Sequence, residues 1–139
     1  MPPRCYVASP LGFTEAGRHY YEQYFIPALR EVVDPVDPWS LGGDSSAPAD
    51  IGRRNAEAID SCVLLAAVLD GQEVDSGTAS EIGYGAAKGL RCFGLRTDLR
   101  ESGEPGVSVN LQVQHFIEAS GGRVVATLDE LVAALREAA

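Results

Sequence analysis

A chain of 139 residues has the length of one domain. We expect that domain to span residues 1–139 and to bury roughly two thirds of its unfolded surface without disulfides or metals. The 20 acidic and 11 basic residues give a net charge of −9, so the phosphates of a polynucleotide would repel the protein. The charge argues against a nucleic-acid partner and favours a small neutral or cationic ligand.

The cysteines and the apolar segments indicate the compartment. Cys5, Cys62 and Cys92 each lie at the edge of an apolar run, where a reduced cysteine behaves as a small hydrophobe, so core packing is favoured over catalysis. No apolar segment approaches the roughly 18 residues of a membrane span, and no signal-peptide core follows residues 1–4. We expect a cytoplasmic protein with no membrane partner.

The first predicted elements are a short strand and a long helix. Residues 5–8 form an apolar run, which Pro10 and Gly12 end in a loop because proline cannot donate to a ladder and glycine permits the turn. A helix is predicted over residues 14–33, where aromatic side chains recur at helical spacing. Pro27 predicts a kink or break in this helix.

The rest of the chain alternates between strand and helix. The run at 63–69 is apolar without a break, which is typical of a strand covered on both faces. The predicted elements after the first helix are a proline-interrupted edge strand at 34–39, a loop at 41–48, a helix at 50–61, a strand at 63–69, a helix at 78–88, a strand at 90–95, a polar loop at 97–108, a helix at 110–119, a strand at 124–126 and a helix at 128–138.

This alternation predicts an α/β protein with a parallel sheet and right-handed crossovers. We expect a three-layer, flavodoxin/Rossmann-like fold with a five-stranded parallel sheet in the order 2-1-3-4-5. The switch point of that order lies between strands one and three. A ligand should therefore contact the loop at 9–13 and the loop that follows residue 69.

An acid-rich segment, residues 70–84, begins where the most apolar run ends. Asp70, Asp75 and Glu81 should converge at one edge of the sheet. Such a group suggests either a metal site or carbohydrate chemistry, in which one carboxyl attacks and another moves protons. No second acid cluster or histidine pair completes a metal cage, and the glycines form neither a dinucleotide-binding nor a triphosphate-binding loop. We expect no metal and no cofactor.

Each of these acids also has a purely structural interpretation. Residues 78–81 match a capping box, in which Glu81 would only bond the helix N-terminus. A first-turn carboxylate is also held ionised by the helix dipole, as a nucleophile requires. Asp70 precedes Gly71 in an ordinary turn dipeptide, and Asp75 could be a solvated loop acid.

Three stretches form a more specific pattern that covers nearly the whole chain: residues 6–10, residues 55–60 and residues 70–84. Its most specific part is Asp-Ser-Gly-Thr-Ala-Ser-Glu-Ile-Gly-Tyr at 75–84. With this pattern the chain resembles the nucleoside 2-deoxyribosyltransferase family. The resemblance implies an enzyme that transfers 2-deoxyribose from one nucleobase to another, with retention, through a covalent deoxyribosyl-glutamate. A deoxynucleoside and a free nucleobase would be its small-molecule partners.

The resemblance also implies residue roles. Glu81 would attack C1′, Asp75 would protonate or hydrogen-bond the departing base, and the Tyr6 hydroxyl would position the nucleophile. Asn110 resembles a residue that family members extend across a subunit interface into the neighbour's sugar site. We therefore expect a homo-oligomer, either a dimer or a trimer of dimers.

Further substrate contacts are expected around these residues. Phe13 and Trp39 could stack on a nucleobase, and core packing is the alternative for Phe13. Asp50 is the nearest candidate for the family's sugar-binding acid, although it is displaced by about a residue or two from the matching position. The remaining expected substrate-binding residues are Ser9, Asp70, Gly71 and Gly77.

Two other functions stay open. One is a related hydrolase of deoxynucleoside 5′-monophosphates, which needs amides, serine and arginine around the phosphate. Residues 9–13 offer one serine and no arginine, which favours an unphosphorylated substrate, but Arg18, Arg53 and Arg54 keep this alternative open. The other is a non-catalytic module that binds nucleosides or nucleotides. Residues 34–48 have no close match in the family, so base preference is not predicted.

Overall fold

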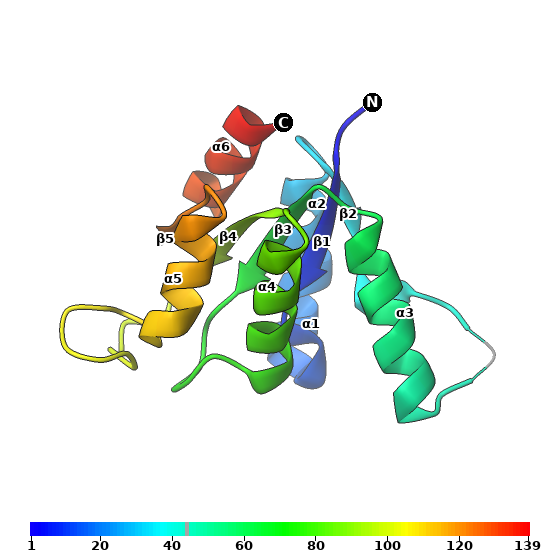
Figure 1. The fold of residues 1–139 in the computed structure, drawn as a ribbon, viewed down its shortest axis with the longest axis horizontal. Coiled ribbons are helices and arrows are strands. Elements are labelled where there is room, and N and C mark those ends of the chain that lie inside the picture. Colours follow the sequence, from blue (N-terminus) through cyan, green and yellow to red (C-terminus); the bar gives the residue numbers. More distant parts are fainter. Residues whose placement is uncertain (44) are drawn as a thin grey trace.

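A parallel five-stranded sheet forms the centre of the protein (Figure 1). The strand order is β2-β1-β3-β4-β5, as predicted. The computed structural model describes residues 1–43 and 45–139, so residue 44 of the predicted loop at 41–48 lies outside the described residues. The strands are β1 (Arg4–Ala8), β2 (Asp34–Val36), β3 (Leu64–Val68), β4 (Arg91–Leu95) and β5 (Val124–Val125).

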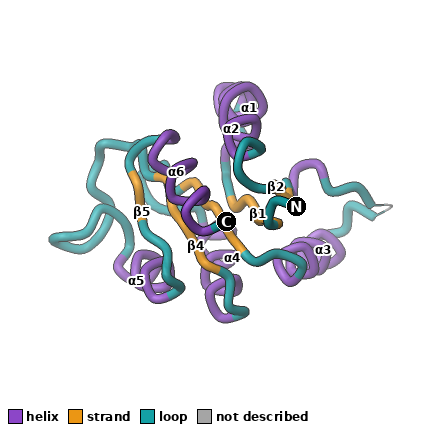
Figure 2. The backbone as a smooth tube through the Cα atoms, turned by 90° about the horizontal axis from the view of Figure 1, so that it is seen from above, coloured by secondary structure: helices purple, strands orange, loops and turns teal. Residues whose placement is uncertain are grey.

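Helices cover both faces of the sheet, which gives three layers. Seen from above, α1, α2 and α6 lie on one side of the strands, and α3, α4 and α5 lie on the other (Figure 2). The helices are α1 (Glu15–Tyr20), α2 (Ile26–Leu29), α3 (Pro48–Asp60), α4 (Ser76–Ala87), α5 (Leu111–Ala119) and α6 (Leu128–Ala138). This arrangement confirms the predicted α/β fold.

β3 shows why the sequence selects this architecture. All of its residues are buried, and successive side chains enter opposite cores. Leu64 packs in the core under α1, α2 and α6, whereas Leu65 packs in the core under α3, α4 and α5. An uninterrupted apolar run is therefore needed at this position. Cys5, Cys62 and Cys92 are buried free thiols in the two cores, as predicted.

The long helix predicted at 14–33 is divided. Thr14 caps α1 through its hydroxyl, which accepts a hydrogen bond from Gly17 N at 3.0 Å. A π-helical turn, Tyr21–Phe25, then precedes α2, which contains Pro27 in its first turn. Because Pro27 has no N–H, the regular ladder cannot continue through it, and the π-helical turn is the break that Pro27 predicted. α2 ends at Leu29, before the predicted end at residue 33.

The carboxyl ends of β1 and β3 meet at one edge of the sheet, because the strands are parallel and paired from Cys5 with Leu64 to Ala8 with Ala67. The loop after β1 and the segment before α4 therefore lie near each other. No helix in the described residues is long and apolar enough to cross a membrane.

Candidate functional site

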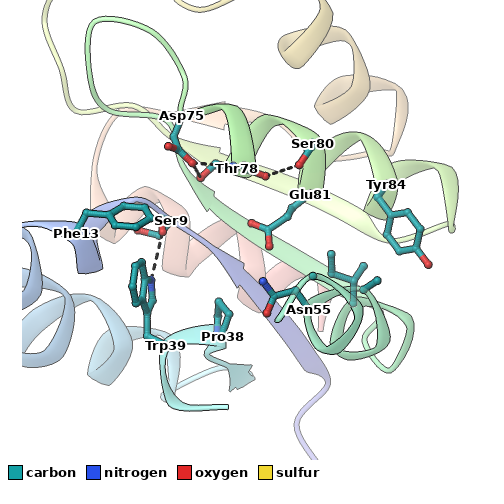
Figure 3. Close-up of a pocket in the computed structure, with 14 residues that line it drawn as sticks. Ser9, Phe13, Pro38, Trp39, Asn55, Asp75, Thr78, Ser80, Glu81 and Tyr84 are labelled. Atoms are coloured by element: carbon teal, nitrogen blue, oxygen red, sulfur yellow. Dashed lines mark hydrogen bonds between the residues drawn. The ribbon is translucent and has the colours of Figure 1, made fainter. Parts of the chain in front are cut away.

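A tyrosine and a glutamate form the buried part of the site. Tyr6 lies on β1 and is 0% exposed, and its hydroxyl donates a hydrogen bond to Oε2 of Glu81 on α4. Glu81 is half-buried and lines a cavity. Tyr6 on β1 thus holds one oxygen of the Glu81 carboxylate. The carboxyl group itself lies at the cavity (Figure 3).

Burial determines the protonation behaviour of this pair. Burial raises the pKa of Glu81, the charge of Asp75 raises it further, and the hydrogen bond from Tyr6 lowers it. The pKa of Tyr6 is raised well above its ordinary range, first by burial and then by the hydrogen bond to Glu81. The tyrosine therefore stays a hydrogen-bond donor, and it favours the ionised form of the glutamate.

Asp75, not Thr78, caps the helix that carries Glu81. Oδ2 of Asp75 accepts hydrogen bonds from Thr78 N at 3.0 Å and from Thr78 Oγ1 at 3.1 Å. α4 begins at Ser76, so Thr78 lies inside the helix and the predicted capping box is wrong. Glu81 lies in the second turn, beyond the first turn where the helix dipole acts most strongly. The Glu81 side chain therefore takes no part in capping α4 and lines the cavity.

The cavity has a volume of about 510 Å³ and lies between four segments of the chain. They are the loop after β1, the 3-10 turn Pro38–Ser40, α3 and α4. Asp75 and Glu81 are the charged side chains among its lining residues, and none of the described lining residues is cationic. Its lining residues are Ser9, Phe13, Pro38, Trp39, Gly52, Asn55, Ala56, Ile59, Asp75, Gly77, Thr78, Ser80, Glu81 and Tyr84.

Two exposed aromatic side chains form one wall of the cavity. The rings of Phe13 and Trp39 meet edge to face, with centroids 4.7 Å apart and planes at 86° (Figure 3). Phe13 is 68% exposed and Trp39 is 45% exposed, so the core-packing alternative for Phe13 is wrong. Exposed aromatic rings beside a cavity offer a surface on which a planar ligand can stack.

Two of the predicted substrate residues connect loops instead of lining this cavity. Asp70 accepts hydrogen bonds from the backbone of Thr97 at 2.7 Å and of Asp98 at 2.9 Å. Gly71 has φ +121°, and its amide donates to Oδ2 of Asp98 at 3.2 Å. Both residues therefore fasten the loop after β3 to the loop after β4.

Asp50 and Asn110 also lie away from the lining. Asp50 pairs with Arg53 at 3.3 Å on the surface of α3, and hydrogen bonds from Ser45 and Arg53 lower its pKa. Oδ1 of Asn110 caps α5 by accepting from Gln112 N at 2.9 Å. Asn110 lines a second cavity, of about 460 Å³, between α4 and α5, and Ser80 lines both cavities.

Sequence reasoning did not assign Asn55, which lies on α3 and faces Glu81 across the cavity (Figure 3). The spacing in the sequence could have indicated this position. Asn55 lies one helical turn before Ile59, which is buried, so both side chains share the face of α3 that points to the sheet. Tyr84 was also unassigned. It lines the cavity, and its hydroxyl donates to Asp60 at 2.8 Å. In the described chain, no group of three or more His, Cys, Asp or Glu side chains is arranged to hold a metal ion.

Comparison with known proteins identifies the family. The sequence matches the family model described as nucleoside 2-deoxyribosyltransferase over residues 5–127. The chain belongs to this family. The matched range includes all three stretches that carried the resemblance, which is therefore confirmed. A search of curated proteins found no match.

Solved structures agree with this family and with the fold. A conserved protein from Enterococcus faecalis is 26% identical, with 100% of both chains covered and a TM-score of 0.83. A 2-desoxiribosyltransferase from Leishmania mexicana is 25% identical, with 98% of both chains covered and a TM-score of 0.76. A CMP N-glycosidase from Clostridium botulinum is 20% identical, with 94% of this chain and 95% of that chain covered and a TM-score of 0.62, which shows a common fold.

Proposed function

We propose that the protein transfers 2-deoxyribose between nucleobases and that Glu81 is the nucleophile. The observation that carries this proposal is the Glu81 carboxylate, which faces the cavity, takes no part in capping α4 and accepts a hydrogen bond from the buried Tyr6. Membership of the deoxyribosyltransferase family supports an enzyme of this kind.

In the first step, a carboxylate oxygen of Glu81 attacks C1′ of the deoxynucleoside. A C1′–O bond forms, the C1′–N bond breaks, and the base leaves with the bonding electron pair. The transition state resembles an oxocarbenium ion, so the glutamate anion beneath C1′ stabilises it. Tyr6 holds the carboxylate in one orientation and stays protonated, since its pKa is raised.

In the second step, a ring nitrogen of the acceptor base attacks C1′ on the face that the first base has left. The new C1′–N bond forms, the ester bond to Glu81 breaks, and the free carboxylate is restored. The N–H proton of the acceptor passes to Asp75, which replaces the proton that Asp75 gave to the departing base in the first step. Two displacements at one carbon give net retention. Water in place of the acceptor base would give hydrolysis by the same route.

Asp75 is the proposed proton carrier for the base. Its Oδ2 accepts hydrogen bonds from the amide and the hydroxyl of Thr78, and its Oδ1 accepts none from the described residues. Asp75 lines the cavity together with Ser9 and Gly77, which we propose as substrate contacts. A proton delivered to a ring nitrogen as the C1′–N bond breaks lowers the leaving-group barrier.

The charges around the cavity favour an unphosphorylated substrate. Asp75 and Glu81 would repel a 5′-phosphate. Of the three arginines that keep the phosphate alternative open, Arg18 donates to the Gly12 carbonyl at 3.4 Å and Arg53 pairs with acids of α3. The third, Arg54, lies beside Gly43 and is not among the residues that line the cavity. We therefore propose a 2′-deoxynucleoside as donor and a free nucleobase as acceptor, with no cofactor.

The test is base exchange between 2′-deoxyinosine and free adenine, followed by chromatography. The wild type should form deoxyadenosine and hypoxanthine, and Glu81→Ala should form neither. Glu57→Gln, an exposed acid of α3, is the matched control and should retain exchange. Exchange by Glu81→Ala at the wild-type rate would overturn the proposal.

Further arms of the same assay separate the alternatives. Hypoxanthine release that does not depend on adenine would indicate a hydrolase. Faster base release from deoxyadenosine 5′-monophosphate than from deoxyadenosine would indicate a nucleotide substrate. Binding without release of any base would indicate a non-catalytic module.

We also propose that the protein is a homo-oligomer, with Asn110 completing the sugar site of a neighbouring subunit. In one chain Asn110 lines the second cavity, beside the exposed apolar side chains of Leu111 (51% exposed) and Phe116 (39% exposed). Light scattering combined with activity tests this proposal, because a fully active monomer would contradict it.

A further inference from the structure

Trp39 is the only tryptophan of the chain. Its ring lines the cavity that contains Glu81, and almost half of the residue is exposed. A large exposed ring normally costs side-chain entropy to hold in one place. The contacts around Trp39 show what holds it.

Asp37 holds the backbone of Trp39. Oδ1 of Asp37 accepts a hydrogen bond from Trp39 N at 2.9 Å, which caps the 3-10 turn that carries the indole. The same oxygen accepts a hydrogen bond from Oη of Tyr21 at 2.7 Å. One carboxylate oxygen therefore connects the cavity wall to Tyr21.

Tyr21 anchors this connection in the core. It is 3% exposed and belongs to the π-helical turn before Pro27, where its ring stacks on Phe25 at a centroid distance of 5.8 Å. Burial, together with the hydrogen bond to Asp37, raises the pKa of Tyr21, so the hydroxyl stays a donor. The π turn thus presents a fixed hydroxyl to Asp37, and such turns are frequent at functional sites.

The ring of Trp39 is also confined from the loop after β1. Its Nε1 donates to the carbonyl oxygen of Ser9 at 3.4 Å, and the edge-to-face contact with Phe13 closes another side (Figure 3). Gly12 lies so close beneath the ring that a Cβ atom there would be 2.4 Å from Cε2 of Trp39. The indole is therefore fixed by contacts on several sides and still presents a surface to the cavity.

We propose that Asp37, held by Tyr21, is a positioning residue that fixes Trp39 as a stacking wall for the nucleobase. The proposal rests on the proposed function, because the base is the group that is exchanged. A planar heteroaromatic ring is the ligand that an exposed indole recognises, and stacking on an aromatic side chain tolerates any base. Residues 37–39 thus set affinity for the base, whereas Glu81, which Tyr6 orients, reacts with the sugar carbon.

The single tryptophan makes the wall directly observable. Adenine and cytosine, each titrated into the wild-type protein, should change the emission of Trp39 in a saturable way, and 2-deoxyribose, which has no base, should not. Tyr21→Phe should weaken base binding about fivefold, the usual effect of one lost hydrogen bond, and Asp37→Ala, which loses two, should weaken it at least as much. Asp37→Asn keeps an acceptor oxygen and should stay within about twofold.

Tyr24→Phe is the matched control, because Tyr24 belongs to the same π turn and is 59% exposed. It should bind bases as the wild type does. In base exchange, Tyr21→Phe should raise KM about fivefold and change kcat less than about twofold, a division that a general loss of structure would not produce. Unchanged base affinity in both Tyr21→Phe and Asp37→Ala would overturn the positioning role. If Asp37→Ala does not fold, Tyr21→Phe alone decides it.

Failure of the wall and failure of the proposed function give different results. Saturable quenching of Trp39 emission without any base exchange would support stacking of the base on Trp39 and refute the transferase. Base exchange with no change in Trp39 emission, and with an unchanged KM in Trp39→Ala, would refute the wall and leave the transferase standing.

Discussion

The Tyr6 hydroxyl donates a hydrogen bond to Glu81, although the two residues are 75 positions apart in the sequence. Parallel pairing of β1 with β3 brings them together, because Tyr6 is in register with Leu65 and α4 follows β3. The bond satisfies a polar group of a fully buried side chain and orients a carboxylate at the cavity.

Tyr6→Phe removes this hydrogen bond and keeps the ring. We expect kcat for base exchange to fall about ten- to a hundredfold, because the carboxylate loses its orientation. The Tyr6 bond lowers the pKa of Glu81, so its loss should raise that pKa and move the acid limb of the pH–rate profile to higher pH. Tyr24→Phe, an exposed tyrosine, is the control. An acid limb that stays in place or moves to lower pH would contradict this assignment.

Glu81→Gln should stabilise the fold near neutral pH while abolishing exchange. Burial raises the pKa of Glu81 in the folded state, so its ionised form costs folding free energy. That cost is absent below the pKa of an unfolded glutamate, about 4.3, and grows as the pH rises through the folded pKa. The thermal midpoint of the variant should therefore exceed that of the wild type near neutral pH. The difference between the two thermal midpoints should vanish near pH 4. A lower midpoint of Glu81→Gln at neutral pH would show that the ionised Glu81 does not destabilise the fold.

The sheet order and the layers could be predicted because each depends on a repeated pattern. Strands alternate with helices throughout, and the run at 63–69 has no polar residue that would expose a face of β3. Boundaries were less accurate because they depend on single side chains. Thr78 and Asp75 are both good caps, and the sequence does not tell which of them accepts from the helix amides.

The site was predicted in part for a related reason. Spacing along the chain brings Glu81, Asp75 and Ser9 to one edge of the sheet, but it does not give the direction of each side chain. Asp70 also lies at that edge, where it turns toward the loop after β4 and accepts from Thr97. Asn55 lies on α3, and its part in the cavity follows only from how α3 packs beside α4.

Asp75 combines a structural duty with a proposed chemical one, and two substitutions separate them. Asp75→Asn keeps an oxygen that can cap α4, so its stability should stay close to that of the wild type. Asp75→Ala loses the cap and should lower the free energy of unfolding by about 1 kcal/mol. If Asp75 carries the proton, both variants should lose exchange by about a hundredfold or more. Full activity in Asp75→Asn would contradict the proton-carrying role and leave Asp75 as the helix cap only.

Arg96 holds together the loops beside the site, and Arg96→Met should therefore destabilise the fold. The residue is 5% exposed, and its guanidinium donates to the carbonyl oxygens of Leu69 at 2.8 Å, Gly71 at 2.6 Å and Arg100 at 2.7 Å. Loss of these bonds should cost about 3 kcal/mol in urea unfolding, because the carbonyls lose a charged donor. Arg123→Met, which breaks only an exposed pair with Glu137, should change stability by less than about 1 kcal/mol. Equal effects of the two substitutions would contradict the role given to Arg96.

Gly12→Ala should disturb base recognition far more than stability. An added Cβ would be 2.4 Å from the Trp39 ring, and a fused ring cannot bend away, so the indole must move as a unit. The Cα of Gly12 and the ring lie at the surface, so the thermal midpoint should change by no more than about 2 °C.

The emission maximum of Trp39 should shift, and KM for the acceptor base should rise about fivefold while the pH dependence of kcat stays unchanged. Gly42→Ala is the control, because a Cβ on this glycine would meet no described atom within 4 Å and Gly42 is not among the residues that line the cavity. Since Gly12 touches Trp39 and not Glu81, an effect on KM alone would separate recognition of the base from chemistry at the sugar. An unshifted emission with an unchanged KM would mean that the loop yields and that the position of the ring does not depend on Gly12.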